Sequence, residues 1–195
     1  MEAHESHELI EQSEEHGHSS KKWTALLISI FAMVLAINNV GGGNATKEAT
    51  KNNILASNVY AFYQAKSIRQ SEYKIAVNDL LLRLEQDPKM PEGVKTKINE
   101  QIEDYKKTIE RYESDPVKKE GKVQLLEKAK ELEQERDHAL AQDPMFDYAE
   151  GILQIAIVLL SISIIANLGI LLLVGSGLGL LGTLLMFNGF FLVIV

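Results

Sequence analysis

The C-terminal residues 151–195 carry no charged side chain, and this feature constrains the fold more than any other. The 20 Lys and Arg and the 27 Asp and Glu residues of the 195-residue chain all lie between Glu2 and Glu150. One membrane crossing needs only about 20 consecutive apolar residues. The uncharged run is therefore long enough for two crossings, and a soluble globular enzyme is excluded as a description of the whole chain.

Composition excludes several kinds of chemistry. The chain has no cysteine, which excludes disulfides, thiolate catalysis, iron–sulfur clusters and cysteine zinc sites. Its net charge of −7 gives no basis for nucleic-acid binding. Neither an HExxH pattern nor a P-loop occurs, and nothing marks a pair of carboxylates held in a dry pocket. We therefore predict no catalytic residue and no cofactor.

The N-terminal residues 1–22 are acidic and rich in histidine, and we expect a flexible tail there. Imidazole and carboxylate groups suit zinc or nickel, but no rigid frame holds the histidines together, so they are weak metal candidates and no metal site is predicted. The four histidines concerned are His4, His7, His16 and His18.

Residues 23–40 are uncharged and follow Lys21-Lys22, which predicts a first membrane helix with Trp23 at the headgroup level. A cleaved signal peptide is the alternative. The acidic leader and the length of the apolar run favour an uncleaved signal anchor.

Residues 44–143 are charged and helical in pattern, and we expect the glycines at 41–43 to break the preceding helix. Apolar side chains recur at heptad spacing, which predicts the seam of a coiled coil. The first column is Ile54, Ala61, Ile68, Ile75 and Leu82. The later column is Ile98, Ile102, Tyr105, Ile109 and Tyr112, and the pattern resumes at Leu125, Ala129 and Leu132.

Three Asp-Pro pairs occur at residues 87–88, 115–116 and 143–144, and each can restart a helix. The chain must return to the membrane, so the first two pairs cannot both be full reversals. Two prolines and a glycine in residues 87–93 favour the reversal there, with a kink at 115–116. The region is then an antiparallel helical hairpin with arms of roughly 65–75 Å.

The pair Asp143-Pro144 is expected to begin the last part of the chain, with membrane helices over 151–166 and 170–195. Residues 167–169 are the favoured turn, and a later turn at 175–177 is the alternative. The predicted fold is an all-α membrane protein: three transmembrane helices, with a long extramembrane antiparallel coiled-coil hairpin between the first and second.

Two segments resemble a known family. Residues 59–69, VYAFYQAKSIR, look like the signature of a bacterial membrane family catalogued as domain of unknown function 4337, and residues 147–156 resemble its second landmark. The acidic leader, the early span and the apolar C-terminal pair also fit. Basic residues often separate the last two spans in this family, whereas this chain has uncharged residues at 166–169. The resemblance implies the architecture and no activity.

Two sets of residues are candidates for assembly and packing. The first lies in the signature and is expected to pack the hairpin or a second subunit, with a binding patch of cations on aromatic faces as the alternative. It comprises Tyr60, Phe62, Tyr63, Lys66, Ile68 and Arg69. The second is expected to bring membrane helices together through small residues and polar groups. It comprises Gly175, Gly179, Gln154 and Asn188.

These features favour a non-enzymatic membrane protein that forms a homo-oligomeric helical scaffold or envelope assembly in membrane lipid. The alternative is a subunit of a small oligomeric channel or transporter, and metal binding by the tail is a third hypothesis. An unidentified membrane protein partner also stays open. The expected location is the bacterial inner membrane, multi-pass, with a cytoplasmic N-terminus because Lys21-Lys22 precede the first span. The hairpin is then periplasmic.

Overall fold

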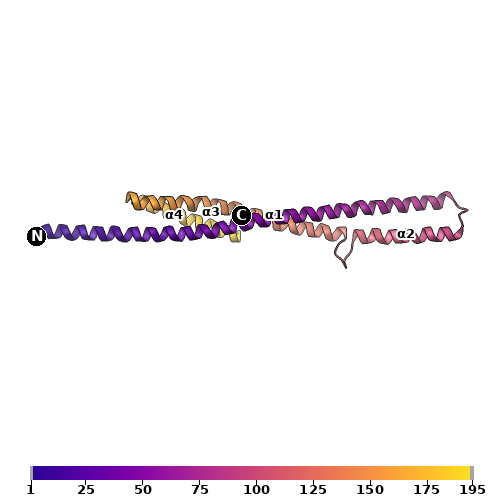
Figure 1. The fold of residues 1–195 in the computed structure, drawn as a ribbon, viewed down its shortest axis with the longest axis horizontal. Coiled ribbons are helices and arrows are strands. Elements are labelled where there is room, and N and C mark those ends of the chain that lie inside the picture. Colours follow the sequence, from indigo (N-terminus) through magenta and orange to yellow (C-terminus); the bar gives the residue numbers. More distant parts are fainter. Residues whose placement is uncertain (1, 194–195) are drawn as a thin grey trace. The chain divides into compact units, whose positions relative to one another are not determined.

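The computed structural model describes residues 2–193, and the side chains of residues 21–193. Four α-helices follow one another and no strand occurs among the described residues, which confirms the all-helical expectation. They are α1 (Glu2–Gln86), α2 (Glu92–Glu113), α3 (Lys122–Ala166) and α4 (Gly169–Phe191) (Figure 1).

Three of these helices are long and apolar enough to cross a membrane. They are α1, within its part from Lys21 to Gln86, together with α3 and α4. By length and composition, this agrees with the three spans expected from the sequence. The turn between α3 and α4 lies at Asn167 and Leu168, and Asn167 has a positive φ of 53°.

Two helices continue where the sequence predicted interruptions. α1 begins at Glu2, inside the expected flexible tail, and passes through residues 41–44 without a break. α3 likewise runs through Pro144, which was expected to begin a helix. In the tail, Glu is a good helix former, and an existing helix at residues 23–40 removes the nucleation cost.

Close packing explains why a glycine stands at position 41 inside α1. A Cβ atom at Gly41 would lie 2.7 Å from the Phe146 ring and 2.8 Å from the Phe190 ring. Phe146 is 2% exposed and packs with Ala149, just after Pro144. An interior glycine costs about 1 kcal/mol and an interior proline about 3 kcal/mol, which burial of several apolar side chains can offset.

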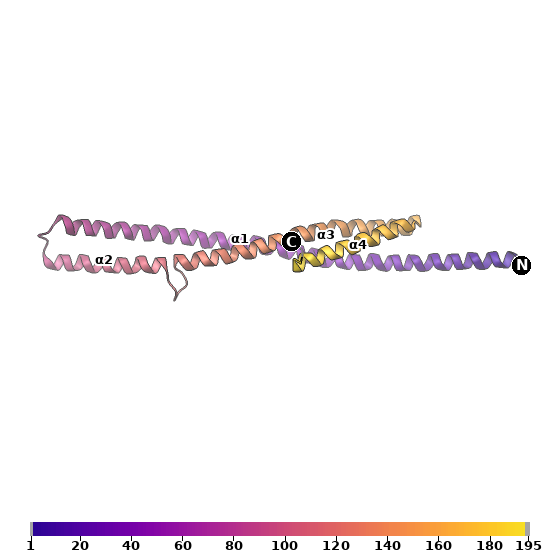
Figure 2. The same cartoon turned by 180° about the vertical axis from the view of Figure 1, so that it is seen from behind.

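The chain divides into two compact units. Unit 1 joins the residues up to Ala49 with those from Asp137 onward, and unit 2 comprises Thr50–Arg136. In unit 1, α3 and α4 lie side by side (Figures 1 and 2). One face of α4 is almost free of side chains, which lets its neighbours approach the backbone. Its buried residues recur at steps of four and three: Gly175, Gly179, Gly182, Met186 and Gly189.

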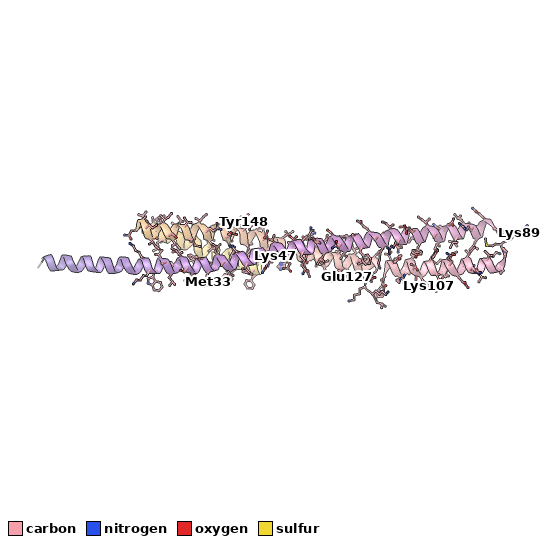
Figure 3. All side chains as sticks on the ribbon, in the orientation of Figure 1. Met33, Lys47, Lys89, Lys107, Glu127 and Tyr148 are labelled. Carbon is pink, nitrogen blue, oxygen red and sulfur yellow. The ribbon has the colours of Figure 1, made fainter. Side chains whose placement is uncertain are left out.

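In unit 2, the later part of α1 contacts α2 and the part before it contacts α3, so α1 runs antiparallel to both. The ring centroids of Tyr73 and Tyr105 are 5.0 Å apart. Earlier in α1, the Tyr60 hydroxyl donates to the Glu133 carboxylate of α3 at 3.1 Å. The turn that joins α1 to α2 contains Lys89, whose N–H donates to the Asp87 carboxylate at 3.2 Å (Figure 3).

The Asp115-Pro116 pair lies in a full interruption, not the kink expected from the sequence. α2 ends at Glu113 and α3 begins only at Lys122. The Asp115 carboxylate accepts the Lys118 N–H at 2.9 Å, and its backbone carbonyl accepts the Lys119 N–H at 2.8 Å. Pro116 has no N–H to continue a helix, and Lys119 adopts a left-handed φ of 55°. The resulting loop extends away from the helices of unit 2 (Figure 1).

Candidate assembly surface

The inner face of α1 in unit 2 combines aliphatic, aromatic and polar residues, and it does not contain the predicted isoleucine column. Buried and half-buried positions recur at alternating steps of four and three, which is heptad spacing. They are Asn52, Ala56, Val59, Tyr63, Lys66, Gln70, Tyr73, Val77, Leu80 and Leu84. The sequence pattern predicts a different seam, formed by the column that begins at Ile54.

The predicted column of α1 instead lies on the outside of unit 2, which corrects that assignment. The exposed fractions are 55% for Ile54, 61% for Ile68, 69% for Ile75 and 52% for Leu82, and Ala61 is also exposed. Phe62 and Leu55, 41% and 39% exposed, widen the same apolar strip. We call these seven residues the outer column. The sequence pattern had correctly identified an apolar face but had assigned it to the wrong partner.

The six signature residues divide between these two faces. Tyr60 and Tyr63 are half-buried, and Lys66 is buried. Phe62 and Ile68 belong to the outer column, and Arg69 is exposed at the edge of a surface hollow that also contains Tyr73. The signature therefore does not form one patch; it contributes to the internal seam and to the outside of the same helix.

Lys66 is a buried lysine with one ion-pair partner. Only 8% of the residue is exposed, and its Nζ lies 3.6 Å from a carboxylate oxygen of Glu120 in the loop before α3. The ammonium also lies 5.0 Å from the ring centroid of Phe62 and 5.6 Å from that of Tyr112. Aromatic faces stabilise a desolvated cation, so the aromatic residues around Lys66 compensate for part of its lost hydration.

A second polar group joins α1 to the ends of α2 and α3. The Gln70 amide donates to the Ile109 carbonyl at 3.0 Å and to the Glu113 carboxylate at 2.8 Å. The Lys122 ammonium donates to both Gln70 and Glu113 at 3.1 Å. The hydrogen bonds from Gln70 and Lys122 lower the pKa of the Glu113 carboxyl below its ordinary value. Near Glu133, burial and the hydrogen bond to that carboxylate raise the pKa of the Tyr60 hydroxyl.

The membrane-packing candidates lie at separate places in unit 1. A Cβ at Gly175 would lie 2.9 Å from the Leu160 side chain, and one at Gly179 would overlap the Phe31 ring. Gln154 is exposed and donates to the Glu150 carboxylate one turn earlier at 2.9 Å. Asn188 is half-buried, and its carbonyl accepts the Leu192 N–H. The glycines thus contact helices of the same chain.

The described side chains contain no group of three or more His, Asp or Glu residues arranged to hold a metal ion. The four tail histidines lie outside the residues whose side chains are described. His138 is exposed on α3. These observations assign no metal ligand within residues 21–193.

Asn38 of unit 1 is a buried polar residue that the sequence pattern did not single out. Asn38 is 1% exposed and its amide donates to the Phe146 carbonyl at 2.9 Å. Nearby, the Thr46 hydroxyl donates to the Asp143 carboxylate at 2.7 Å. An asparagine inside an otherwise apolar stretch was the available signal, because such a side chain must find a partner on a neighbouring helix.

Comparisons with known proteins place this architecture in one family. No curated protein and no solved structure matches the chain. The family described as Domain of unknown function (DUF4337) matches residues 20–192, a range that includes both the signature helix and all three apolar stretches. The chain therefore belongs to the DUF4337 family, as the resemblance of its two motifs had indicated.

Proposed function

We propose that this chain is a non-enzymatic integral membrane protein that assembles into a homo-oligomeric helical scaffold through the outer column of α1. The observation that carries the proposal is an exposed apolar column on one helix that recurs every seven residues, at Ile54, Ala61, Ile68, Ile75 and Leu82. Single exposed apolar residues are common, but a continuous strip of them marks an interaction surface. A second copy of the same strip is self-complementary about a symmetry axis.

The energetics indicate where such assembly would be effective. Burying the exposed part of each large aliphatic side chain contributes about 1–2 kcal/mol, so four of them on each of two copies contribute roughly 8–16 kcal/mol to a dimer. Association in solution costs an estimated 4–15 kcal/mol. The outer column alone is therefore close to balance for free copies. Anchoring of each copy in one membrane raises the effective concentration and shifts the balance toward assembly.

The proposed placement has three membrane-spanning segments in α1, α3 and α4, with unit 2 outside the membrane as a coiled-coil hairpin. The location is the bacterial inner membrane, with the N-terminus in the cytoplasm and unit 2 in the periplasm. Lys21-Lys22 before the first apolar stretch support this orientation, because basic residues near a span favour the cytoplasmic side. Protease treatment of intact spheroplasts tests it: digestion of unit 2 is expected, and its protection would reverse the orientation.

The assembly is tested with the double variant Phe62→Asp/Ile68→Asp, studied by native mass spectrometry of the full chain in mild detergent. The wild type is expected to appear as an oligomer and the variant as a monomer that still inserts into membranes. Val117→Asp/Val123→Asp is the matched control, because both valines are exposed on unit 2 outside the outer column. A monomeric wild type, or equal dissociation of both variants, would contradict the proposal.

Ion-flux measurement in liposomes separates the scaffold from a channel or transporter subunit. The apolar stretches contain no ionisable side chain, and a path for ions or protons ordinarily includes one. No flux above that of empty liposomes is expected. Reproducible selective conductance would contradict the scaffold function and support the channel or transporter function.

A further inference from the structure

A polar cavity of about 190 Å³ lies in unit 1 between α1 and α3. Its polar lining comes from residues 38–46 of α1 and 143–150 of α3, where the apolar stretch of each helix ends. Lys47 and Tyr148, labelled in Figure 3, mark these parts of the two helices. A single water needs only about 10–15 Å³ of such volume, so the cavity has room for a small ligand group.

The charged groups that line this cavity are all acidic. Asp143, Asp147 and Glu150 line it from α3, and no Lys or Arg does. One oxygen of Asp143 accepts the Thr46 hydroxyl, and one oxygen of Glu150 accepts the Gln154 amide. Each of these carboxylates has a second oxygen, so the lining offers several negatively charged hydrogen-bond acceptors.

Asn38 adds an independent observation that points to a ligand. It lines the same cavity, is 1% exposed, and its Oδ1 has no hydrogen-bond partner among the described residues. Its amide nitrogen donates to the Phe146 carbonyl, which fixes which end of the amide is the acceptor. Buried polar atoms nearly always have a partner, so Oδ1 requires a donor that residues 21–193 do not supply.

We propose that this cavity binds a primary ammonium group, carried either by a phosphatidylethanolamine headgroup or by a free amine. The inference rests on the membrane placement proposed above, which puts the ends of the apolar stretches at the headgroup level. An ammonium has three N–H donors, which can reach Asn38 Oδ1 and the carboxylates, and its positive charge complements their negative charge. The described carboxylates form no group suited to hold a metal ion, which favours this larger cation.

The test uses the full-length protein reconstituted into lipid nanodiscs of phosphatidylcholine with an equal amount of phosphatidylethanolamine. Native mass spectrometry measures which lipid the protein retains. The wild type is expected to prefer phosphatidylethanolamine by about tenfold, because the quaternary ammonium of phosphatidylcholine has no N–H to donate. The variant Asp147→Asn/Glu150→Gln should lose this preference. The control Glu48→Gln/Glu127→Gln removes two exposed carboxylates outside the cavity and should keep it.

A second arm identifies the source of the amine. Free ethanolamine, added to protein in discs of phosphatidylcholine alone, is expected to raise the thermal midpoint of the wild type and not of the cavity variant. That rise without a lipid preference would assign the site to a free amine. Equal retention of both lipids with no such rise would overturn the proposal, as would a rise with Mg²⁺ or Ca²⁺ alone. Failure of the wild type to enter the discs would refute the membrane placement itself.

Discussion

Two apolar columns with a seven-residue repeat, one on α1 and one on α2, lie in opposite environments in unit 2. The α2 column is buried or half-buried, with Ile102 only 3% exposed and Tyr105 against Tyr73. The α1 column is exposed, with Ile75 at 69%. Heptad spacing therefore shows that a helix has an apolar face, but it does not identify the partner that covers that face.

The inner face of α1 is selected by complementary polar groups. Lys66 meets Glu120, and Gln70 meets both Glu113 and a backbone carbonyl of α2. Each donor must meet its acceptor, so these pairs fix the position of α1 along α2 and α3 more narrowly than aliphatic contacts do. The more apolar face of α1 is thereby left on the outside.

The largest expected effect is the difference in unfolding free energy between alanine substitutions in the two columns. In the dissociated background Phe62→Asp/Ile68→Asp, Ile102→Ala should lower the free energy of unfolding by about 2–4 kcal/mol, because it removes buried methyl groups. Ile75→Ala in the same background should change it by less than about 0.5 kcal/mol. Chemical denaturation in detergent, followed by circular dichroism, measures both. Equal losses would show that the α1 column is internal after all.

In unit 1, α4 has a third buried column, which consists of four glycines and Met186. Gly179→Ala should destabilise the protein by about 1–3 kcal/mol, because its Cβ would overlap the Phe31 ring. Gly177→Ala meets nothing within 4 Å and should stabilise α4 by up to about 1 kcal/mol. Thermal midpoints of the two variants in detergent test this. Similar midpoints would mean that α4 does not pack against α1 in this way.

The smallest expected effect is the pH dependence of stability that arises from Glu113, which accepts hydrogen bonds from Gln70 and Lys122. The folded-state pKa of Glu113 lies below its ordinary value of 4.5, so the charged form stabilises unit 2. This stabilisation is complete above that value and is lost as the pH falls through the folded-state pKa. Glu113 is 53% exposed, so screening keeps the effect small. Glu113→Gln should lower stability at neutral pH and show a weaker acid dependence. Glu110→Gln is the exposed control, and thermal midpoints on both sides of pH 4.5 provide the measurement.

Local sequence signals predicted the helices and their apolar stretches well. Three signals predicted structure from neighbouring residues alone: the absence of charge over residues 151–195, the heptad spacing on α2 and the turn at Asn167. Local signals failed at Gly41 and Pro144, where helix breakers lie inside continuous helices. At Gly41 the close approach of Phe146 and Phe190 explains the glycine, and those residues are distant in sequence.

The sequence by itself determined an all-helical chain with three stretches able to cross a membrane, because helix propensity and hydrophobicity are properties of consecutive residues. Only the tertiary structure decided which face of α1 is internal and which residues line the cavity at Asn38. Both depend on pairs far apart in the chain, such as Gln70 with Glu113 and Thr46 with Asp143. Periodicity along one helix contains no information on the position of the other member of such a pair.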